Sequence, residues 1–277
     1  MPLSQLSTFQ NEGAVSEVIV LDTIADAQAF SKANSAPYFV LGKGSNTVIN
    51  PDSPIQTYVQ ISPDLLPLSH SGTILTASAG TRVNQLTKYC VQHGLAGFEF
   101  AAGVPASLGG MVTMNFGCWG RELCDFLISI QVVDHAGDVH TIPLADLEMT
   151  YRSSRVMRER WIVLSATVQL SASTPADVHA KTDDAIQTRL AKQPLRGRTF
   201  GSTFKNPPNE FAARLIESAG LKGFEKNGVQ ISDKHANFLI NTGGATFQAL
   251  QDMLALIEET VAKQHGVRLE REVRLVQ

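Results

Sequence analysis

Apolar residues recur along the chain with two spacings, and each spacing predicts one kind of element. Short runs that alternate with polar residues, or that are continuously apolar between turn residues, predict β-strands. We expect strands at residues 16–21, 38–41, 56–61, 73–78, 161–168, 229–232, 237–241 and 269–274. Two further runs between residues 127 and 141 flank a glycine turn and predict a hairpin. The chain therefore carries strands from near its start to its end.

Apolar residues three and four positions apart predict amphipathic helices. The clearest pattern consists of Leu250, Met253, Leu254, Ile257 and Val261. A second apolar face around Leu86 and Cys90 ends at Gly94, a residue suited to the left-handed end of a helix. Other helices are expected at residues 22–33, 174–192 and 212–219. Cys90 is expected to be a core residue rather than a nucleophile.

The composition is that of a soluble protein with a sizeable core. The 277 residues are 43% hydrophobic and 18% charged and carry a formal net charge of −3. A chain of this length is expected to form two or three lobes. No block of lysines and arginines is present, so we expect no nucleic-acid partner. No apolar run reaches the roughly 18 residues of a membrane span, and no basic leader is present, so neither membrane insertion nor export is expected.

The three cysteines are Cys90, Cys118 and Cys124. An odd number without paired CxxC spacing indicates neither a disulfide framework nor a zinc site. We therefore expect reduced thiols, a cytoplasmic location and no bound metal.

A glycine-rich turn follows the strand expected at residues 38–41. It consists of Gly42, Lys43, Gly44, Ser45 and Asn46. A strand that ends in such a turn leaves backbone N–H groups unpaired, and these groups can bind a pyrophosphate. Two glycines and an asparagine also form an ordinary tight turn, so these residues alone leave both interpretations open.

Small residues are concentrated between residues 98 and 120. The positions of interest are Gly103, Val104, Pro105, Ser107, Gly109, Gly110, Asn115, Gly117 and Gly120. Because glycine has no side chain, a backbone of this kind can lie directly against a flat or anionic ligand. The alternative is a tightly packed loop between strands.

The stretch from Gly201 to Pro207 combines a hydroxyl, an ammonium and a carboxamide in Ser202, Lys205 and Asn206. Pro207 disfavours a helical conformation at Asn206, so Ser202 is expected on a loop, where its hydroxyl can serve catalysis or anion binding. The alternative is a capped helix start, with Asn206 or Asn209 as the N-cap of the helix around residues 210–217.

These segments occur in order with Tyr151-Arg152-Ser153-Ser154 and the C-terminal Leu269-Glu270-Arg271-Glu272-Val273-Arg274. In this combination the chain resembles the UDP-N-acetylenolpyruvoylglucosamine reductases, flavoenzymes of bacterial cell-wall synthesis. The resemblance extends from about Leu41 to Gln277. The 50-residue spacing between Arg152 and Ser202 is similar to that of the family's shorter, type II layout.

The resemblance implies an α+β protein. It would consist of an FAD-binding fold of the PCMH/VAO type, made of two α/β subdomains, and a C-terminal α+β substrate-binding domain. The first FAD-binding subdomain is expected at residues 1–55, joined by the C-terminal strand at 267–277. The second is expected at residues 56–196, and the substrate-binding domain at 197–266.

The implied reaction reduces the enolpyruvyl ether of UDP-N-acetylglucosamine to a lactyl ether, with FAD as bound cofactor and NADPH as hydride donor. Both glycine-rich segments are then expected to bind FAD. By the same resemblance Arg152, Ser202 and Glu272 are the catalytic residues. Arg152 and Glu272 would offset the negative charge of the intermediate, and Ser202 would protonate the carbon beside the carboxylate.

The resemblance also implies a set of substrate-binding residues. These are Tyr151, Lys205, Asn206 and His235, of which His235 fits a turn residue equally well. The expected partner is a small nucleotide-sugar substrate, and the chain is expected to act as a monomer.

Two other functions are compatible with the residues. One is a related FAD-dependent oxidase or dehydrogenase acting on an alcohol or sugar, which would react quickly with oxygen and would not need Ser202 as an acid. The other is a non-catalytic binding protein on the same fold, suggested by Glu12 and Phe116, which stand where the family usually has glycine and alanine. The joint presence of Arg152, Ser202 and Glu272 favours the reductase.

Overall fold

The computed structural model describes all residues from 1 to 277, and their contacts divide the chain into two compact units. Unit 1 consists of Met1–Glu17, Lys43–Thr57 and Arg189–Gln277. Unit 2 consists of Val18–Gly42 and Tyr58–Thr188. Each unit is thus assembled from segments that are far apart in the sequence.

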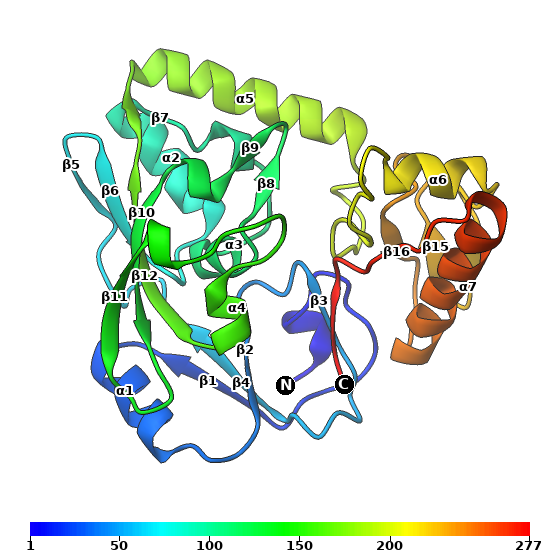
Figure 1. The fold of residues 1–277 in the computed structure, drawn as a ribbon, viewed down its shortest axis with the longest axis horizontal. Coiled ribbons are helices and arrows are strands. Elements are labelled where there is room, and N and C mark those ends of the chain that lie inside the picture. The colour runs from blue at the N-terminus through cyan, green and yellow to red at the C-terminus, as the bar shows by residue number, and fades with distance from the viewer. The chain divides into compact units, whose positions relative to one another are not determined.

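Unit 2 is built around a five-stranded antiparallel sheet with the order β11-β10-β12-β6-β5 (Figure 1). Its strands are β5 (Ser69–Ser71), β6 (Ile74–Ser78), β10 (Leu127–Val133), β11 (Val139–Pro143) and β12 (Ile162–Gln169). The central strand β12 pairs with β10 and β6 and is mostly buried. Its side chains share one apolar core with helices α2 (Val83–His93) and α3 (Leu108–Thr113).

A second sheet of unit 2 has the order β1-β4-β2, with β1 (Glu17–Leu21), β4 (Thr57–Ile61) and β2 (Tyr38–Val40). Helix α1 (Ile24–Ala33) follows β1 and starts with a capping box, in which Thr23 and Asp26 each accept a hydrogen bond from the backbone N–H of the other. The side chains of Leu21, Ala27 and Val59 form its core.

Several short elements and the long helix α5 complete this part of the chain. They are β7 (Leu95–Ala96), β8 (Gly117–Cys118), β9 (Arg121–Glu122), β13 (Ser171–Ala172), α4 (Arg155–Glu159), α5 (Pro175–Lys192) and the 3₁₀ turns η2 (Glu99–Ala101), η3 (Leu123–Asp125) and η4 (Leu144–Asp146). β8 pairs with β9, and β7 pairs with β13.

Unit 1 contains the three-stranded sheet β14-β15-β16 and helices α6 and α7, which Figure 1 shows in yellow and orange to red. The elements are η1 (Leu3–Gln5), α6 (Ala212–Ser218), β14 (Glu225–Lys226), β15 (Val229–Ile231), β16 (Leu239–Asn241) and α7 (Phe247–His265). The apolar stripe of α7 packs on this sheet and on α6 in one core. A parallel pair joins the C-terminal β17 (Arg274–Val276) to β3 (Thr47–Ile49).

Most of the predicted elements are confirmed within two or three residues. The amphipathic patterns correspond to α2 and α7, each of which ends at a left-handed glycine, Gly94 or Gly266. The hairpin between residues 127 and 141 corresponds to β10 and β11. Cys90 is 1% exposed, and its burial raises the pKa of the thiol to about 12, as expected for a core residue.

The predicted strands at 237–241 and 269–274 are partly wrong. β16 begins at Leu239, and β17 begins at Arg274. Residues 269–273 do not form a regular ladder, because they meet the chain at residues 203–205 through a single bridge, Phe204 to Arg271. The regular pairing starts only where the chain reaches β3.

The compact units do not follow the predicted domain boundaries. Residues 18–42, which we assigned to the first subdomain, join residues 58–188, because β1 and β2 both lie beside β4 in one sheet. The three-domain division stays a prediction. No helix combines the length and the apolar composition that are needed to cross a membrane.

Candidate active site

Within unit 2, two of the predicted cofactor-binding segments meet at the start of α3. A Cβ at Gly42 would lie 2.5 Å from Oγ of Ser107 and 3.9 Å from Cα of Gly110. Gly109 lies against Ala79, to whose carbonyl oxygen it donates its N–H across 2.8 Å. Only residues without side chains allow these backbones to approach so closely.

The preceding segment of the same element, Gly103 to Pro105, forms a turn after η2. Gly103 has a φ of 80°. The N–H of Val104 donates to the carbonyl oxygen of Ala101, and the N–H of Ala106 donates to the carbonyl oxygen of Val104. The segment from 103 to 110 thus enters α3 through consecutive turns. Both interpretations of this stretch, a packed loop and a backbone surface for a ligand, agree with this geometry.

Within unit 1, the rest of the first glycine-rich turn lies beside the C-terminal segment. The side-chain amide of Asn46 donates to the carbonyl oxygen of Glu272 (3.1 Å). The N–H of Arg274 donates to the backbone carbonyl oxygen of Asn46 (3.0 Å). Gly44 has a φ of 61°, and a Cβ there would overlap with the carbonyl oxygen of Leu6. Gly44 therefore fixes the turn against the N-terminal segment.

Two of the three predicted catalytic residues, Ser202 and Glu272, are also brought together in unit 1. The N–H of Glu272 donates to the carbonyl oxygen of Thr203 across 2.8 Å, and Ser202 directly precedes Thr203. A Cβ at Gly201 would lie 3.7 Å from the carbonyl oxygen of Ser45. The turn, the serine and the C-terminal glutamate therefore form one cluster.

Arg152 belongs to unit 2, where it occupies the second position of a two-residue turn. The backbones of Thr150 and Ser153 exchange two hydrogen bonds around it, and its φ is 56°. Its guanidinium donates to the carbonyl oxygen of Gly117 (2.8 Å) and lies 4.9 Å from the ring centre of Tyr151. A left-handed backbone conformation costs free energy at an arginine, so the surrounding fold must stabilise it.

Asn115 has a structural role in the same region. Its Nδ2 donates to Glu122 (2.8 Å) and to the carbonyl oxygen of Thr150 (3.2 Å), and its Oδ1 accepts from the N–H of Cys124. The residue is fully buried. Asn115 thus ties the turn that carries Arg152 to the β8–β9 hairpin, in which Gly117 pairs with Glu122 and Gly120 has a φ of 75°.

Two predicted substrate-binding residues make local contacts. Lys205 forms an ion pair with Glu270 (2.5 Å). Asn206 accepts a hydrogen bond from the N–H of Ala212 through its Oδ1 (3.1 Å). Asn206 thus holds the first residue of α6, although the residue at the N-cap position of that helix is Phe211.

The third of these residues, His235, is partly buried. Its ring meets that of Phe238 edge to face, and its Nδ1 accepts a hydrogen bond from the N–H of Asn237 (3.3 Å). Burial lowers the pKa of His235 below its usual value of 6.5, so the neutral ring is favoured.

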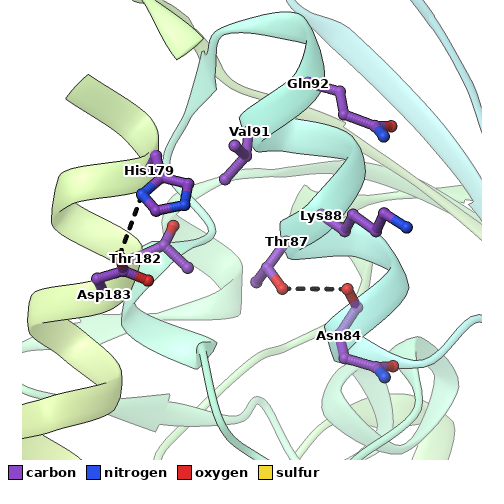
Figure 2. Close-up of a pocket in the computed structure, with 8 residues that line it drawn as sticks. All are labelled: Asn84, Thr87, Lys88, Val91, Gln92, His179, Thr182 and Asp183. Carbon is purple, nitrogen blue, oxygen red and sulfur yellow. Dashed lines mark hydrogen bonds and ion pairs between the residues drawn. The ribbon is translucent and has the colours of Figure 1, made fainter. Parts of the chain in front are cut away.

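A hollow outside these segments lies between α2 and α5 (Figure 2). It is lined by Asn84, Thr87, Lys88, Val91, Gln92, His179, Thr182 and Asp183. None of the predicted site residues lines it. No three His, Cys, Asp or Glu side chains are grouped so that they could hold a metal ion.

The predicted cofactor segments fit FAD in their donor chemistry. Neither residues 42–46 nor residues 103–110 contain a carboxylate, and each segment has backbone N–H groups and one serine hydroxyl, that of Ser45 or Ser107. Such a set favours an anionic diphosphate. The close approach of Gly42, Ser107 and Gly110 provides the side-chain-free surface that a large flat cofactor needs.

Comparisons with known proteins agree with this chemistry. Residues 15–143 match the family model of an FAD-binding domain. Residues 193–276 match the C-terminal domain of UDP-N-acetylenolpyruvoylglucosamine reductase.

Relatives named UDP-N-acetylenolpyruvoylglucosamine reductase match over most of the chain. The one from Clostridium perfringens is 37% identical over 262 residues, which cover 95% of this chain and 84% of the relative. The one from Listeria monocytogenes is 34% identical over 278 residues, which cover 99% and 93%. The crystal structure of the reductase from Thermus caldophilus has a TM-score of 0.87 at 27% identity and covers 100% of this chain and 98% of its own.

An FAD-binding domain followed by this C-terminal domain defines a flavin-dependent oxidoreductase with an α+β fold. Within that class, the chain belongs to the UDP-N-acetylenolpyruvoylglucosamine reductase family. The expected family, fold class and cofactor are confirmed. The roles of individual residues stay predictions, as does the meeting of Arg152 from unit 2 with Ser202 and Glu272 from unit 1.

Proposed function

We propose that Arg152, Ser202 and Glu272 carry the reaction of this family in this chain. The reaction reduces UDP-N-acetylglucosamine enolpyruvate to UDP-N-acetylmuramate, a precursor of peptidoglycan, with NADPH as the reductant. The backbone hydrogen bond that holds Glu272 beside Thr203, next to Ser202, is the single observation that supports it best.

FAD, when bound, relays a hydride from NADPH to the substrate. We assign its binding to the residues predicted from the two glycine-rich segments. Of these, Gly42, Ser107 and Gly110 provide a backbone surface, and Lys43 and Ser45 provide donors for the diphosphate. Asn115 and Gly117 support this region through the hydrogen bonds that hold the β8–β9 hairpin and Arg152.

Arg152 and Glu272 stabilise the negative charge that develops on the substrate. When a hydride reaches the far carbon of the enolpyruvyl double bond, the electron pair of that bond moves toward the carboxylate. The guanidinium of Arg152 offsets this charge, and Glu272 in its protonated form donates a hydrogen bond to it. The strained backbone of Arg152 supports a functional role, since such conformations persist where the fold gains from them.

Ser202 completes the reduction. Its Oγ–H transfers a proton to the carbon beside the carboxylate, and the resulting alkoxide takes a proton back from water. A serine hydroxyl is a weak acid, so this step requires a strongly basic carbon and accurate positioning. The segment that carries Ser202 is held on both sides by backbone hydrogen bonds, which supports that positioning.

The substrate is held by Tyr151, Lys205, Asn206 and His235. The ion pair of Lys205 with the exposed Glu270 is worth little, so a diphosphate can compete with the carboxylate for the ammonium. Asn206 is positioned by the hydrogen bond that its Oδ1 accepts from the N–H of Ala212, and we assign this residue to the UDP moiety.

The chain acts as a cytoplasmic monomer without a nucleic-acid partner. Three cysteines without a disulfide agree with a reducing compartment, in which NADPH is also present. The net charge of −3 disfavours binding to a polyanion.

Half-reactions measured separately test this assignment. Purified protein should be yellow, should lose its flavin absorbance on addition of NADPH, and should regain it on addition of the enolpyruvyl substrate. In Ser202→Ala the loss of absorbance should be unchanged, whereas its return should be slower by roughly 10²- to 10⁴-fold. Equal slowing of both half-reactions, or none, would refute the role of Ser202.

A further inference from the structure

The segment that carries Ser202 is clamped by a residue that does not belong to the predicted site. Asn237 lies between β15 and β16 and is 4% exposed. Its Oδ1 accepts the N–H of Phe204 (2.9 Å), and its Nδ2 donates to the carbonyl oxygen of the same residue (2.8 Å). One planar amide therefore satisfies both polar backbone groups of Phe204.

The main chain of Asn237 adds a third hydrogen bond. Its carbonyl oxygen accepts from the N–H of Thr203 across 2.8 Å. Three hydrogen bonds thus join one asparagine to the two residues that directly follow Ser202. On the other side of this segment, Glu272 donates to the carbonyl oxygen of Thr203.

We call these three hydrogen bonds of Asn237 the clamp. They hold a segment that has no regular β-sheet pairing. Residues 202–205 pair with their neighbours only through the single bridges Ser202 to Phe238 and Phe204 to Arg271. Without a regular ladder, the conformation of the segment depends on a few buried hydrogen bonds. If one of these bonds is lost, the buried group left without a partner costs the free energy of its desolvation. The hydroxyl of Ser202 takes no part in the clamp, which is made by backbone atoms and the Asn237 amide.

We infer that Asn237 is a positioning residue for the proton transfer, because it fixes the backbone from which the Ser202 hydroxyl projects. The inference rests on the proposed role of Ser202. A misplacement of about 1 Å can cost roughly 10²-fold in rate even when all reacting groups are present. Loss of the clamp should therefore slow protonation without affecting the reaction with NADPH.

The test compares two changes of Asn237 with one of Asn241 in the FAD-loaded enzyme. Asn237→Ala removes both side-chain bonds, and Asn237→Asp keeps the shape but loses the Nδ2 donor. Asn241→Ala is the matched control, since Asn241 is 2% exposed and its side chain bonds Phe9, Gln10 and Gly243 in the same unit rather than the residues that follow Ser202. All three should lower the melting temperature, because each leaves buried backbone groups unpaired.

Stopped-flow measurements then distinguish positioning from general destabilisation. Both Asn237 variants should reduce flavin with NADPH at the normal rate, and the return of flavin absorbance on addition of substrate should slow by roughly 10²-fold for Asn237→Ala. The solvent deuterium isotope effect on that step should rise, since proton transfer becomes limiting. Asn241→Ala should change neither rate, although its melting temperature falls.

Two outcomes would overturn the inference in different ways. If Ser202→Ala slows the substrate half-reaction and folded Asn237→Asp and Asn237→Ala do not, only the positioning role fails. If Ser202→Ala itself leaves that half-reaction unchanged, the proposed acid fails and the inference fails with it.

Discussion

The backbone N–H of Glu272 donates to the carbonyl oxygen of Thr203 across 2.8 Å, although the two residues are far apart in the sequence. This bond places the C-terminal glutamate beside the serine that precedes Thr203. Because main-chain atoms make the bond, the relative position of Ser202 and Glu272 does not depend on the side chain of either.

The left-handed conformation of Arg152 predicts that a glycine variant is more stable than an alanine variant at this position. At a φ of 56°, Arg152→Gly should be more stable than Arg152→Ala by about 1 kcal/mol, because only glycine adopts this conformation without strain. Urea unfolding of both variants measures the difference, and neither should turn over substrate. At the helical position Arg158 the order should reverse, with glycine about 1 kcal/mol worse than alanine. The same order at both positions would contradict strain at Arg152.

Gly44 lies in close contact with Leu6. Its substitution by alanine should therefore lower the stability of the protein more than a substitution at a glycine that has only a positive φ. Gly220 also has a positive φ, of 76°, but a Cβ there would meet nothing within 4 Å. We expect Gly220→Ala to cost about 1 kcal/mol, and Gly44→Ala to cost about 3 kcal/mol or more, because the added methyl overlaps with a backbone oxygen. Thermal unfolding of the two variants checks this, and equal losses would contradict the packing at Gly44.

The burial of His235 predicts a stability that depends on pH. Because its pKa is lowered in the folded protein, the unfolded chain takes up the proton first as the pH falls below 6.5. The neutral ring contributes its full stability above that pH, and the contribution is lost as the pH falls toward the lowered pKa. His235→Gln should remove this component from the free energy of unfolding measured between pH 7.5 and about pH 5. An equal pH dependence in the unmodified protein and in His235→Gln would contradict this prediction.

The hollow between α2 and α5 predicts a stabilising substitution. Thr182, shown in Figure 2, is 8% exposed, and its hydroxyl oxygen is buried without a hydrogen-bond partner. Thr182→Val keeps the shape and removes the unpaired group, so it should stabilise the protein by about 1–2 kcal/mol. Thr246→Val should instead destabilise it by about 1 kcal/mol, because Thr246 caps α7 through the N–H of Ala249 (3.1 Å). Calorimetric melting temperatures that move the same way would contradict the first prediction.

Local patterns predicted the elements well, since they rest on interactions between near neighbours. The stripe from Leu250 to Val261 predicted α7, which ends at Gly266. The same reasoning placed Ser202 on a loop before the helix that is α6 in the structure. Local patterns did not predict the role of Asn237, because that role depends on hydrogen bonds with Phe204, 33 residues earlier in the chain. The sequence showed Asn237 only as the first residue of the strand predicted at residues 237–241.

The sequence by itself determined the family and the order of helices and strands, because spacing, turn residues and motifs act over short distances. Only the tertiary structure decided which of these residues share a unit, that Asn115 and Asn237 hold the turns bearing Arg152 and Ser202, and that residues 269–273 make isolated contacts rather than a strand. The physical reason is that a buried backbone group must find a partner wherever the folded chain provides one, and that partner is set by packing rather than by sequence distance.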